Sequence, residues 1–294
     1  MTKRVVVAVA TRGDRDLSEL VEALRPQAAQ SDGHILVVVN SHLQVDAEAD
    51  VSVVRELQRG YSHVRNAALK WAIEHGFHFL AFIDDDAHPS HAWLPSLMEA
   101  QGRFDADAVF GPVVSEWATT TPGWIVAADL PGRPAVMPDG PYSAEGRTGN
   151  TLIRLARPMD SGLRFDPLLN RLGGEDVLFF RELRSLGATF VWAQSASVRE
   201  EIGADRARVV RLLERAFRNG RALVWINALG PAPRMPTWRT AIRRLRASGR
   251  LLLAVARSGG RTSALKAAWE LSFVAGVAVE AVLAWPKRHA ARQR

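Results

Sequence analysis

Short runs of apolar residues alternate, over the first 200 positions, with segments in which apolar residues recur every three or four positions. Three continuous runs have the length and β-branched content of buried strands, at residues 5–10, 35–39 and 77–83. After the first run, apolar residues recur at helical spacing from Leu17 to Leu24, and Pro26 is expected to end that helix. A second helical pattern covers residues 62–75. Strands that alternate with helices predict a mainly parallel sheet that helices cover on both faces.

The pattern continues less regularly beyond residue 100. Three further strands are predicted at 107–114, 151–155 and 189–192, with a helix over 176–186. Residues 117–141 are rich in Pro, Gly and Trp without a clear period, which indicates an irregular loop. There Trp117 and Trp124 can either stack on a sugar ring or pack into the core.

Ligands of open α/β sheets bind beyond the carboxyl ends of the strands. The loops at residues 11–14, 40–41 and 84–88 follow three predicted strands. We therefore expect these loops to meet in one crevice and to form the site of the protein.

The composition excludes several classes of protein. The chain has 294 residues, of which 47% are apolar and 23% charged, so it can bury a full core and is not intrinsically disordered. It has no cysteine, which excludes disulfides, thiolate metal sites and cysteine nucleophiles. The apolar run after the basic start ends at Arg12, too early for a signal peptide, so a cytoplasmic location is expected.

Charge divides the chain into an acidic body and a basic tail. Residues 1–204 carry 19 Lys and Arg against 27 Asp and Glu, whereas residues 205–294 carry 19 against four, a net charge of +15. Helices are predicted in the tail from residue 209, over 238–248 and over 264–285. The last contains Lys266, Glu270 and Glu280, which disfavour a membrane-spanning helix.

The basic tail has three possible roles: a solvated face, a nucleic-acid patch or an anchor at a membrane surface. Trp269, Phe273, Trp285 and residues 251–253 supply apolar groups beside the arginines. This combination suits anionic lipid better than nucleic acid, so peripheral binding to the cytoplasmic face of an anionic membrane is expected.

Three adjacent carboxylates, Asp84, Asp85 and Asp86, follow the third strand directly. Such carboxylates repel one another, and a hard divalent cation would relieve the repulsion. The alternatives are an acidic turn before a helix that begins near Ser90, or a zinc site that includes His88 and His91. We favour a hard, oxygen-ligated divalent cation over both.

A second acidic pair, Glu175 and Asp176, follows Gly173 and Gly174 and begins a predicted helix. Acidic residues in the first turn of a helix are common, because they interact favourably with the helix dipole. Alone, the pair is weak support for a catalytic site.

Taken in order, these segments resemble the family 2 glycosyltransferases, inverting enzymes of the GT-A fold that use nucleotide-sugar donors. The resemblance covers residues 5 to 220. It rests on the opening strand, loop and helix, on Gly60 with Arg65-Asn66, on the DxD-like segment 82–86, on residues 149–154 beside the donor-sugar pocket, and on Gly174-Glu175-Asp176.

The resemblance implies a role for each matching residue. Asp86 would be the principal ligand of Mg²⁺ or Mn²⁺, and Asp84 would contact the ribose or the metal shell. Asp176 would be the general base and Glu175 would orient the acceptor. The remaining donor contacts would come from Thr11, Arg12, Asn40, Arg65, Asp85, Gly149 and Asn150.

Two positions depart from the family pattern. Asn40 stands where an acidic residue is frequent, and Gln194 is not followed by the QxxRW pattern of processive synthases, which favours transfer of a single sugar. The expected architecture is a GT-A α/β catalytic domain over residues 1–204 and a basic helical segment over 205–294. The expected function is metal-dependent, inverting transfer of one sugar from a nucleoside-diphosphate sugar to a lipid-linked or envelope glycan. The alternatives are a sugar-phosphate nucleotidyltransferase and a catalytically silent membrane-binding protein.

Overall fold

A central sheet organises the first of two compact units into which the chain divides. The computed structural model describes residues 4–42, 50–130, 136–231, 237–258 and 260–283. The first unit consists of residues 1–115, 134–170 and 175–200, and the second of residues 116–133, 171–174 and 201–294. The second unit thus takes up two short segments from within the range 1–204.

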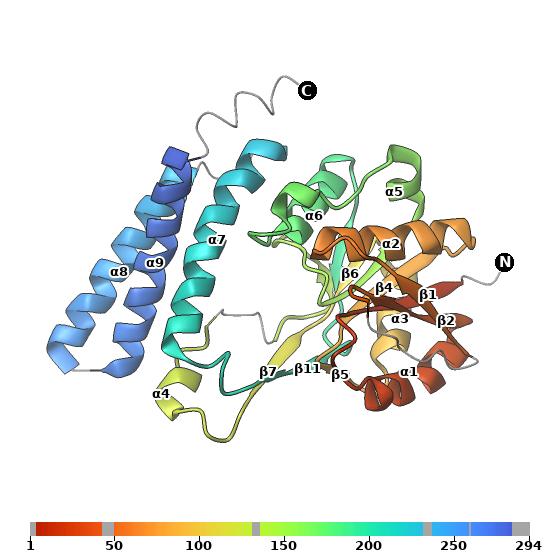
Figure 1. The fold of residues 1–294 in the computed structure, drawn as a ribbon, viewed down its shortest axis with the longest axis horizontal. Coiled ribbons are helices and arrows are strands. Elements are labelled where there is room, and N and C mark those ends of the chain that lie inside the picture. The colour runs from red at the N-terminus through yellow and green to blue at the C-terminus, as the bar shows by residue number, and fades with distance from the viewer. Residues whose placement is uncertain (1–3, 43–49, 131–135, 232–236, 259, 284–294) are drawn as a thin grey trace. The chain divides into compact units, whose positions relative to one another are not determined.

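The sheet has eight strands in the order β3-β2-β1-β4-β9-β6-β10-β8 (Figure 1). Their bounds are β1 Val5–Thr11, β2 Gly33–Val39, β3 Val51–Arg55, β4 Phe79–Asp84, β6 Ala108–Phe110, β8 Gly140–Pro141, β9 Asn150–Arg154 and β10 Phe190–Trp192. The strands β1 to β4 are parallel, whereas β9 runs antiparallel between β4 and β6, and β8 runs antiparallel to β10. The sheet is therefore mainly parallel, as the sequence predicts.

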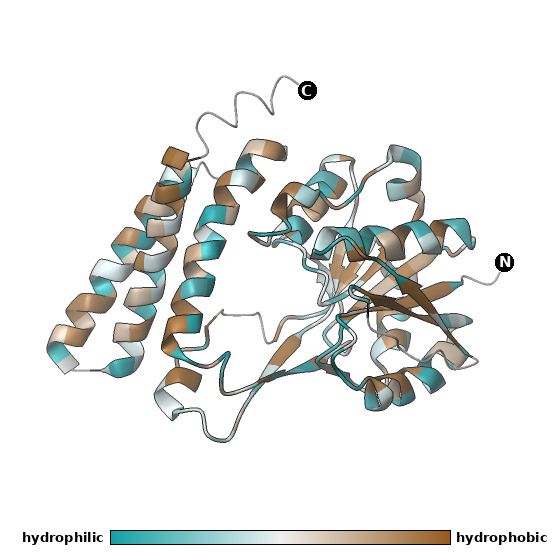
Figure 2. Ribbon diagram, in the orientation of Figure 1, coloured by the Kyte–Doolittle hydropathy of each residue, from teal (hydrophilic) through white to brown (hydrophobic). Residues whose placement is uncertain are grey.

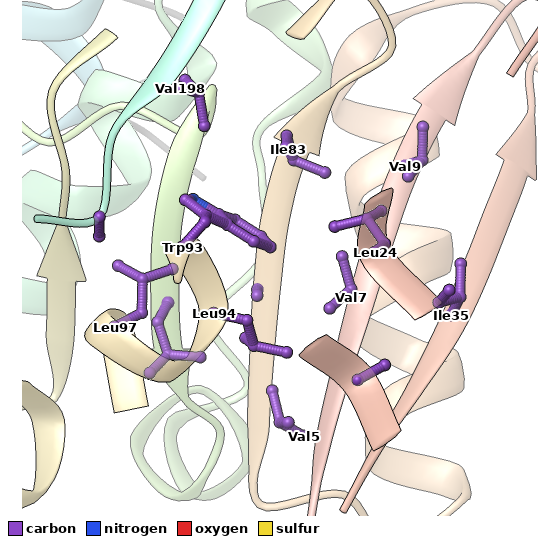
Figure 3. Packing of buried hydrophobic residues seen from close by; sticks show 14 of the residues in the cluster. Val5, Val7, Val9, Leu24, Ile35, Ile83, Trp93, Leu94, Leu97 and Val198 are labelled. Carbon is purple, nitrogen blue, oxygen red and sulfur yellow. The ribbon is translucent and has the colours of Figure 1, made fainter. Parts of the chain in front are cut away.

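Helices cover both faces of this sheet. Their bounds are α1 Ser18–Gln30, α2 Tyr61–Glu74, α3 Trp93–Phe104, α5 Ala156–Ser161 and α6 Glu175–Ser185, with the 3-10 helix η1 at Pro167–Leu169. Val5, Val7 and Val9 of β1 contribute to one core with residues of α1 and α3, and Figure 3 shows Leu24, Trp93 and Leu94 over these strands. The alternate residues of β1 contribute to a second core with residues of α2 and α6.

Two predicted elements differ in the structure. The helix α1 continues past Pro26 to Gln30, because the buried side chain of Gln27 ties this end to α3 by accepting from the amide of Leu94 and donating to the carbonyl of Ser90. The predicted strand 107–114 is split at Gly111-Pro112 into β6 and β7 (Val113–Trp117). A Cβ atom at Gly111 would lie 2.0 Å from the carbonyl oxygen of Ala196, so the chain turns where only glycine fits.

Several short elements have no counterpart in the sequence prediction, β5 (Ala87–Pro89), β8, α5 and η1 among them. The strand β7 belongs to a small sheet of order β5-β11-β7, with β11 at Val198–Ile202. Neither β11 nor the edge strand β3 was expected, and the short helix α4 (Gly123–Val126) lies in the segment expected to be irregular.

The second unit is built around three long helices, α7 Val209–Leu229, α8 Thr237–Ser258 and α9 Arg261–Leu283 (Figure 1). α7 and α9 cross closely at two glycines: a Cβ atom on Gly220 would lie 2.0 Å from the carbonyl oxygen of Phe273, and one on Gly276 equally close to that of Phe217. None of the helices in the described ranges has the length and apolar content that a membrane crossing requires.

The aromatic residues expected at a membrane surface lie elsewhere. Trp269 and Phe273 are buried in the core of the second unit, with Leu212 and Val277. That assignment was wrong, because the helical spacing of these aromatic residues serves the packing of α9. Trp285 lies outside the described residues.

Candidate functional site

The predicted loops meet at the carboxyl edge of the central sheet. Thr11 at the end of β1 is in register with Val39 of β2, and Ala10 with Asp84 of β4. The backbone amide of Asn40 donates to the carbonyl oxygen of Thr11 at 2.8 Å, and the hydroxyl of Ser41 donates to the carbonyl of Arg12 at 2.5 Å. The parallel strands therefore bring the three loops to one place, as expected.

Asp84 reaches across to the start of β9. A Cβ atom at Gly149 would lie 2.7 Å from Oδ2 of Asp84, so this carboxylate occupies the space that any other side chain would fill. Gly149 and Asp84 come from segments 65 residues apart in sequence, yet they share one edge of the crevice. The glycine at this position therefore sets where the carboxylate lies.

Asp85 turns toward β1. It forms a side-chain hydrogen bond with Thr11, whose hydroxyl oxygen also accepts from the amide of Gly13 at 3.1 Å. Burial raises the pKa of Asp85 above its ordinary value, and the nearby Asp86 raises it further, against the hydrogen bond from Thr11, which lowers it. The arrangement ties the acidic loop to the loop after β1.

Arg65 and Glu175 form a buried ion pair between α2 and the start of α6. Burial alone would lower the pKa of Arg65, but the charges of Glu175, Asp176 and Asp84 raise it above its ordinary value. Arg65 therefore lies within electrostatic reach of the acidic residues from both predicted clusters. The structure brings together Arg65, Asp84, Glu175 and Asp176, which the sequence places up to 111 positions apart.

One oxygen of Glu175 has no hydrogen-bond partner among the described residues. Oε1 accepts from Arg65, whereas the buried Oε2 is unsatisfied. Burial raises the pKa of Glu175, the adjacent Asp176 raises it further, and Arg65 opposes both. A buried acceptor without a donor is costly, so a hydroxyl group bound here would be favoured.

Asp176 occupies the second position of α6, and its Oδ1 accepts from the amide of Val177 at 2.7 Å. The preceding Gly173 and Gly174 have φ angles of 81° and 89°, which favour glycine and let the chain turn into the helix. The carboxylate is half-buried, and the positive end of the helix dipole stabilises its charge.

The side chains of Asn40 and Asn150, which were predicted to contact the donor, form hydrogen bonds with neighbouring segments of the protein. Both Nδ2 hydrogens of Asn40 are donated to carbonyls, of Glu56 and Gln58, and its Oδ1 accepts from the amide of Gly60. Asn150 is buried; its Nδ2 donates to the carbonyls of Pro112 and Ala196, and its Oδ1 accepts from Trp93 at 2.8 Å. Neither amide group has a hydrogen left for a ligand, which speaks against the predicted donor contacts of these two side chains.

Two residues that support Arg65 were missed from the sequence. The side-chain Oδ1 of Asn170 accepts from the backbone amide of Ser62 at 2.8 Å and fixes the first turn of α2. Phe165 lies under the Arg65 guanidinium, 5.9 Å from ring centroid to Cζ, and stacks on Phe179. Both lie in a segment without hydrophobic periodicity. The sequence signal for a close approach of the chain to this segment is the glycine at position 60, whose φ of 134° favours glycine.

The acidic side chains of the site suit a metal ion that is bound partly by the protein and partly by the phosphates of a substrate. Within the described ranges, no three His, Asp or Glu side chains are grouped so that they could hold an ion by themselves, which also disfavours the zinc site with His88 and His91. Mg²⁺ is commonly bound by one or two carboxylates together with substrate phosphates and water. Asp84 and Asp86, both half-buried at the end of β4, fit that kind of site.

The loop tryptophans belong to the second unit. Trp117 and Trp124 pack against its hydrophobic core, with Ile125 and Leu212 among the buried members. Their contacts favour the packing role over stacking on a sugar.

Comparisons with known proteins identify a family and one relative by sequence. The sequence model of the family described as Glycosyl transferase family 2 matches residues 17–168, just over half of the chain. The succinoglycan biosynthesis protein ExoM of Rhizobium meliloti is 36% identical over 142 residues, which cover 48% of this chain. The matched segment spans 46% of that relative, less than half of its length.

Solved structures share the fold. S. aureus TarS 1–349 in complex with UDP has a TM-score of 0.52 at 14% identity, over 97% of this chain and 91% of that chain. The complex of TarS 1–349 with UDP-GlcNAc gives a TM-score of 0.52 at 13% identity, over 97% and 92%. The segment matched by the family model contains the acidic loop, Arg65 and Gly149, and the chain therefore belongs to glycosyl transferase family 2.

Proposed function

We propose that this protein transfers a single sugar, with inversion, from a nucleoside-diphosphate sugar to a hydroxyl group of a growing glycan. The observation that carries the proposal is the cluster of Arg65, Asp84, Glu175 and Asp176 at the carboxyl edge of the sheet. Family membership supports the reaction class. TarS binds UDP and UDP-GlcNAc, and ExoM takes part in succinoglycan biosynthesis, which supports a nucleotide-sugar donor and a polysaccharide product here.

The donor diphosphate would bind beside the acidic loop. Asp86 and Asp84 would hold Mg²⁺ or Mn²⁺, which when bound neutralises charge on the leaving diphosphate. Thr11, Arg12 and Asp85 line the loops where the nucleotide would lie. Gly149 leaves the space in which Asp84 keeps its carboxylate.

The acceptor would bind between the two acidic clusters. Asp176 would take the proton from the acceptor hydroxyl as its oxygen forms a bond to the anomeric carbon, while the bond from that carbon to the diphosphate oxygen breaks. The unsatisfied oxygen of Glu175 would accept a hydrogen bond from a second hydroxyl and orient the acceptor. Arg65 holds Glu175 in place through the ion pair.

The acceptor is proposed to be lipid-linked or part of an envelope glycan, reached at an anionic membrane surface. The net charge of +15 over residues 205–294 supports this, because anionic lipid attracts basic segments.

Replacing the proposed base separates binding from turnover. Asp176→Asn should leave the affinity for UDP and Mn²⁺ within about twofold, since neither needs a proton acceptor, while transfer falls by about 10² to 10⁴-fold. Calorimetry measures the first quantity and UDP release in the presence of acceptor the second.

The matched control is Glu19→Gln, which removes another acidic side chain from the first turn of a helix. It should change neither quantity. If Asp176→Asn loses nucleotide affinity together with activity, the residue serves the donor or the fold; if it keeps near-normal turnover, it is not the base.

A further inference from the structure

Helix α8 presents three different faces around its circumference. The face turned toward α9 carries Arg244, whose Nη1 lies 2.7 Å from Oε2 of Glu270 and whose Cζ lies 3.9 Å from the ring centroid of Phe273. Ser248, one turn further along, is buried. This face attaches α8 to the second unit, whereas two rows of side chains on the rest of the helix are exposed.

An exposed apolar stripe follows the helix on its outer side. The first four members recur at spacings of four, three and seven residues, and the fifth lies eleven residues, about three turns, after the second, which places them all on one side of the helix. They are Trp238, Ile242, Leu245, Leu252 and Leu253, and Trp238 and Leu253 each expose 59% of their surface. Figure 2 shows brown and teal segments alternating along this helix. Contiguous exposed apolar surface of this kind marks an interaction site in a folded protein.

An arginine stripe runs beside the apolar one. Arg239, Arg243 and Arg246 each follow a member of the apolar stripe by one position, and Arg250 and Arg257 continue the row. All five are exposed, and across the described part of the chain none of them forms an ion pair, unlike the inward Arg244. Together the two stripes run from Trp238 to Arg257, nearly the whole of α8 and about 30 Å of helix.

We propose that the outer surface of α8 is where the protein binds an anionic lipid bilayer. The apolar stripe would enter the boundary between headgroups and acyl chains, and the arginines would reach lipid phosphates at its edge while their stems stay in the apolar layer. The inference rests on the proposed work at a membrane and names the surface that does it. It moves the contact from Trp269 and Phe273, which are buried, to α8.

The pairing of stripes favours lipid over nucleic acid. A nucleic-acid duplex would interact with the arginines alone, since protein contacts to its phosphates and sugars are polar. A row of exposed leucine, isoleucine and tryptophan side chains has no counterpart there. A bilayer matches both stripes at once.

The test measures co-sedimentation of the full chain with vesicles of phosphatidylcholine alone or with 30% phosphatidylglycerol. Wild type should bind the anionic vesicles, and binding should weaken as salt rises from 0.1 to 0.5 M. The triple variant Arg243→Gln, Arg246→Gln, Arg250→Gln should bind at least tenfold more weakly. Trp238→Ser with Ile242→Ser and Leu253→Ser should weaken binding to a similar degree at both salt concentrations.

Two control variants separate α8 from general effects of charge and exposed apolar residues. Arg208→Gln, Arg211→Gln, Arg218→Gln removes the same charge from the exposed N-cap of α7 and from two exposed positions on that helix. Leu271→Ser, Val279→Ser, Val282→Ser removes exposed apolar groups from α9. Both should keep at least a third of wild-type affinity. All substituted positions are exposed, so thermal unfolding should stay near that of wild type.

Equal losses in the α7 or α9 controls would overturn the assignment to α8, as would tighter binding of wild type to duplex DNA than to anionic vesicles. Absence of wild-type binding to anionic vesicles would overturn both this assignment and the proposed membrane partner. Binding of UDP with Mn²⁺, measured on the same preparations, reports separately on the proposed transferase site and should be unchanged in every variant.

Discussion

Gly149 controls the position of the carboxylate that faces it. In Gly149→Ala, the new Cβ atom would lie 2.7 Å from Oδ2 of Asp84, the mobile end of a side chain, so the carboxylate should move rather than the fold. We expect unfolding free energy to change by less than about 1 kcal/mol and the affinity for UDP with Mn²⁺ to fall about tenfold or more. Gly102→Ala, at a helical position with open space around it, is the control and should keep wild-type affinity. Unchanged affinity in Gly149→Ala would remove Asp84 from the proposed donor site.

Glu182 makes the free energy of unfolding decrease as pH rises. Burial, and secondarily Asp166, raise the pKa of Glu182 to about 7. Because the folded pKa exceeds the unfolded one, folding favours the protonated form, and this contribution is complete below about pH 4.5 and lost as pH rises through 7.

The substitution Glu182→Gln should therefore raise the unfolding free energy at pH 8 relative to wild type and leave the two equal near pH 4.5. The side chain is only partly buried, so solvent screening limits the gain to on the order of 1 kcal/mol. Urea titrations at both pH values measure the difference, with Glu99→Gln on an exposed position of α3 as control. A gain of equal size at both pH values would contradict the assignment.

At the scale of elements, the two glycines where α7 crosses α9 set how closely these helices approach. Gly220→Ala would place a Cβ atom 2.0 Å from the carbonyl oxygen of Phe273, a backbone atom that cannot move alone, so the helices must separate. We expect a loss of roughly 2 kcal/mol in unfolding free energy. Gly249→Ala on α8, where the space is open, should be neutral or slightly stabilising. A stable Gly220→Ala variant would show that the crossing tolerates a wider separation.

Elements with strong periodicity were predictable from sequence, whereas those decided by distant contacts were not. The parallel strands β1, β2 and β4 and the position of the acidic loop follow from local pattern alone. The continuation of α1 past Pro26 depends on Gln27 reaching α3, and the split between β6 and β7 depends on the backbone near Ala196. Local propensity contains no information on either contact.

The acidic clusters of the site could be predicted from the sequence, but the roles of its asparagine side chains could not. Asn40 follows strand β2 and Asn150 begins strand β9, both beside the predicted crevice, yet their hydrogen-bonding groups are used by neighbouring loops. In the tail, the spacing of Trp269 and Phe273 is that of any amphipathic helix, and only packing shows that their side faces α7. The outward stripe of α8 is distinguished by exposure, which sequence alone does not provide.

For the whole molecule, an acidic catalytic body and a basic helical tail divide two tasks in our account: chemistry on a nucleotide sugar, and attachment to the surface where the acceptor lies. The first task is our central claim. A contribution to folding stability does not explain the cluster of carboxylates around Arg65, whereas a metal-dependent donor site does. Buried pairs such as Arg65 with Glu175 contribute little net stability compared with apolar side chains.

The most direct test is thermal unfolding of wild type and Asp86→Asn with a panel of nucleoside diphosphates, UDP first, each with and without Mn²⁺. At about 100 times its Kd, one nucleotide should stabilise wild type by about 2.7 kcal/mol with Mn²⁺. The stabilisation should be much smaller without the metal and absent in Asp86→Asn, whose melting without ligand should match wild type. No stabilisation by any nucleotide, or equal stabilisation in Asp86→Asn, would contradict the account.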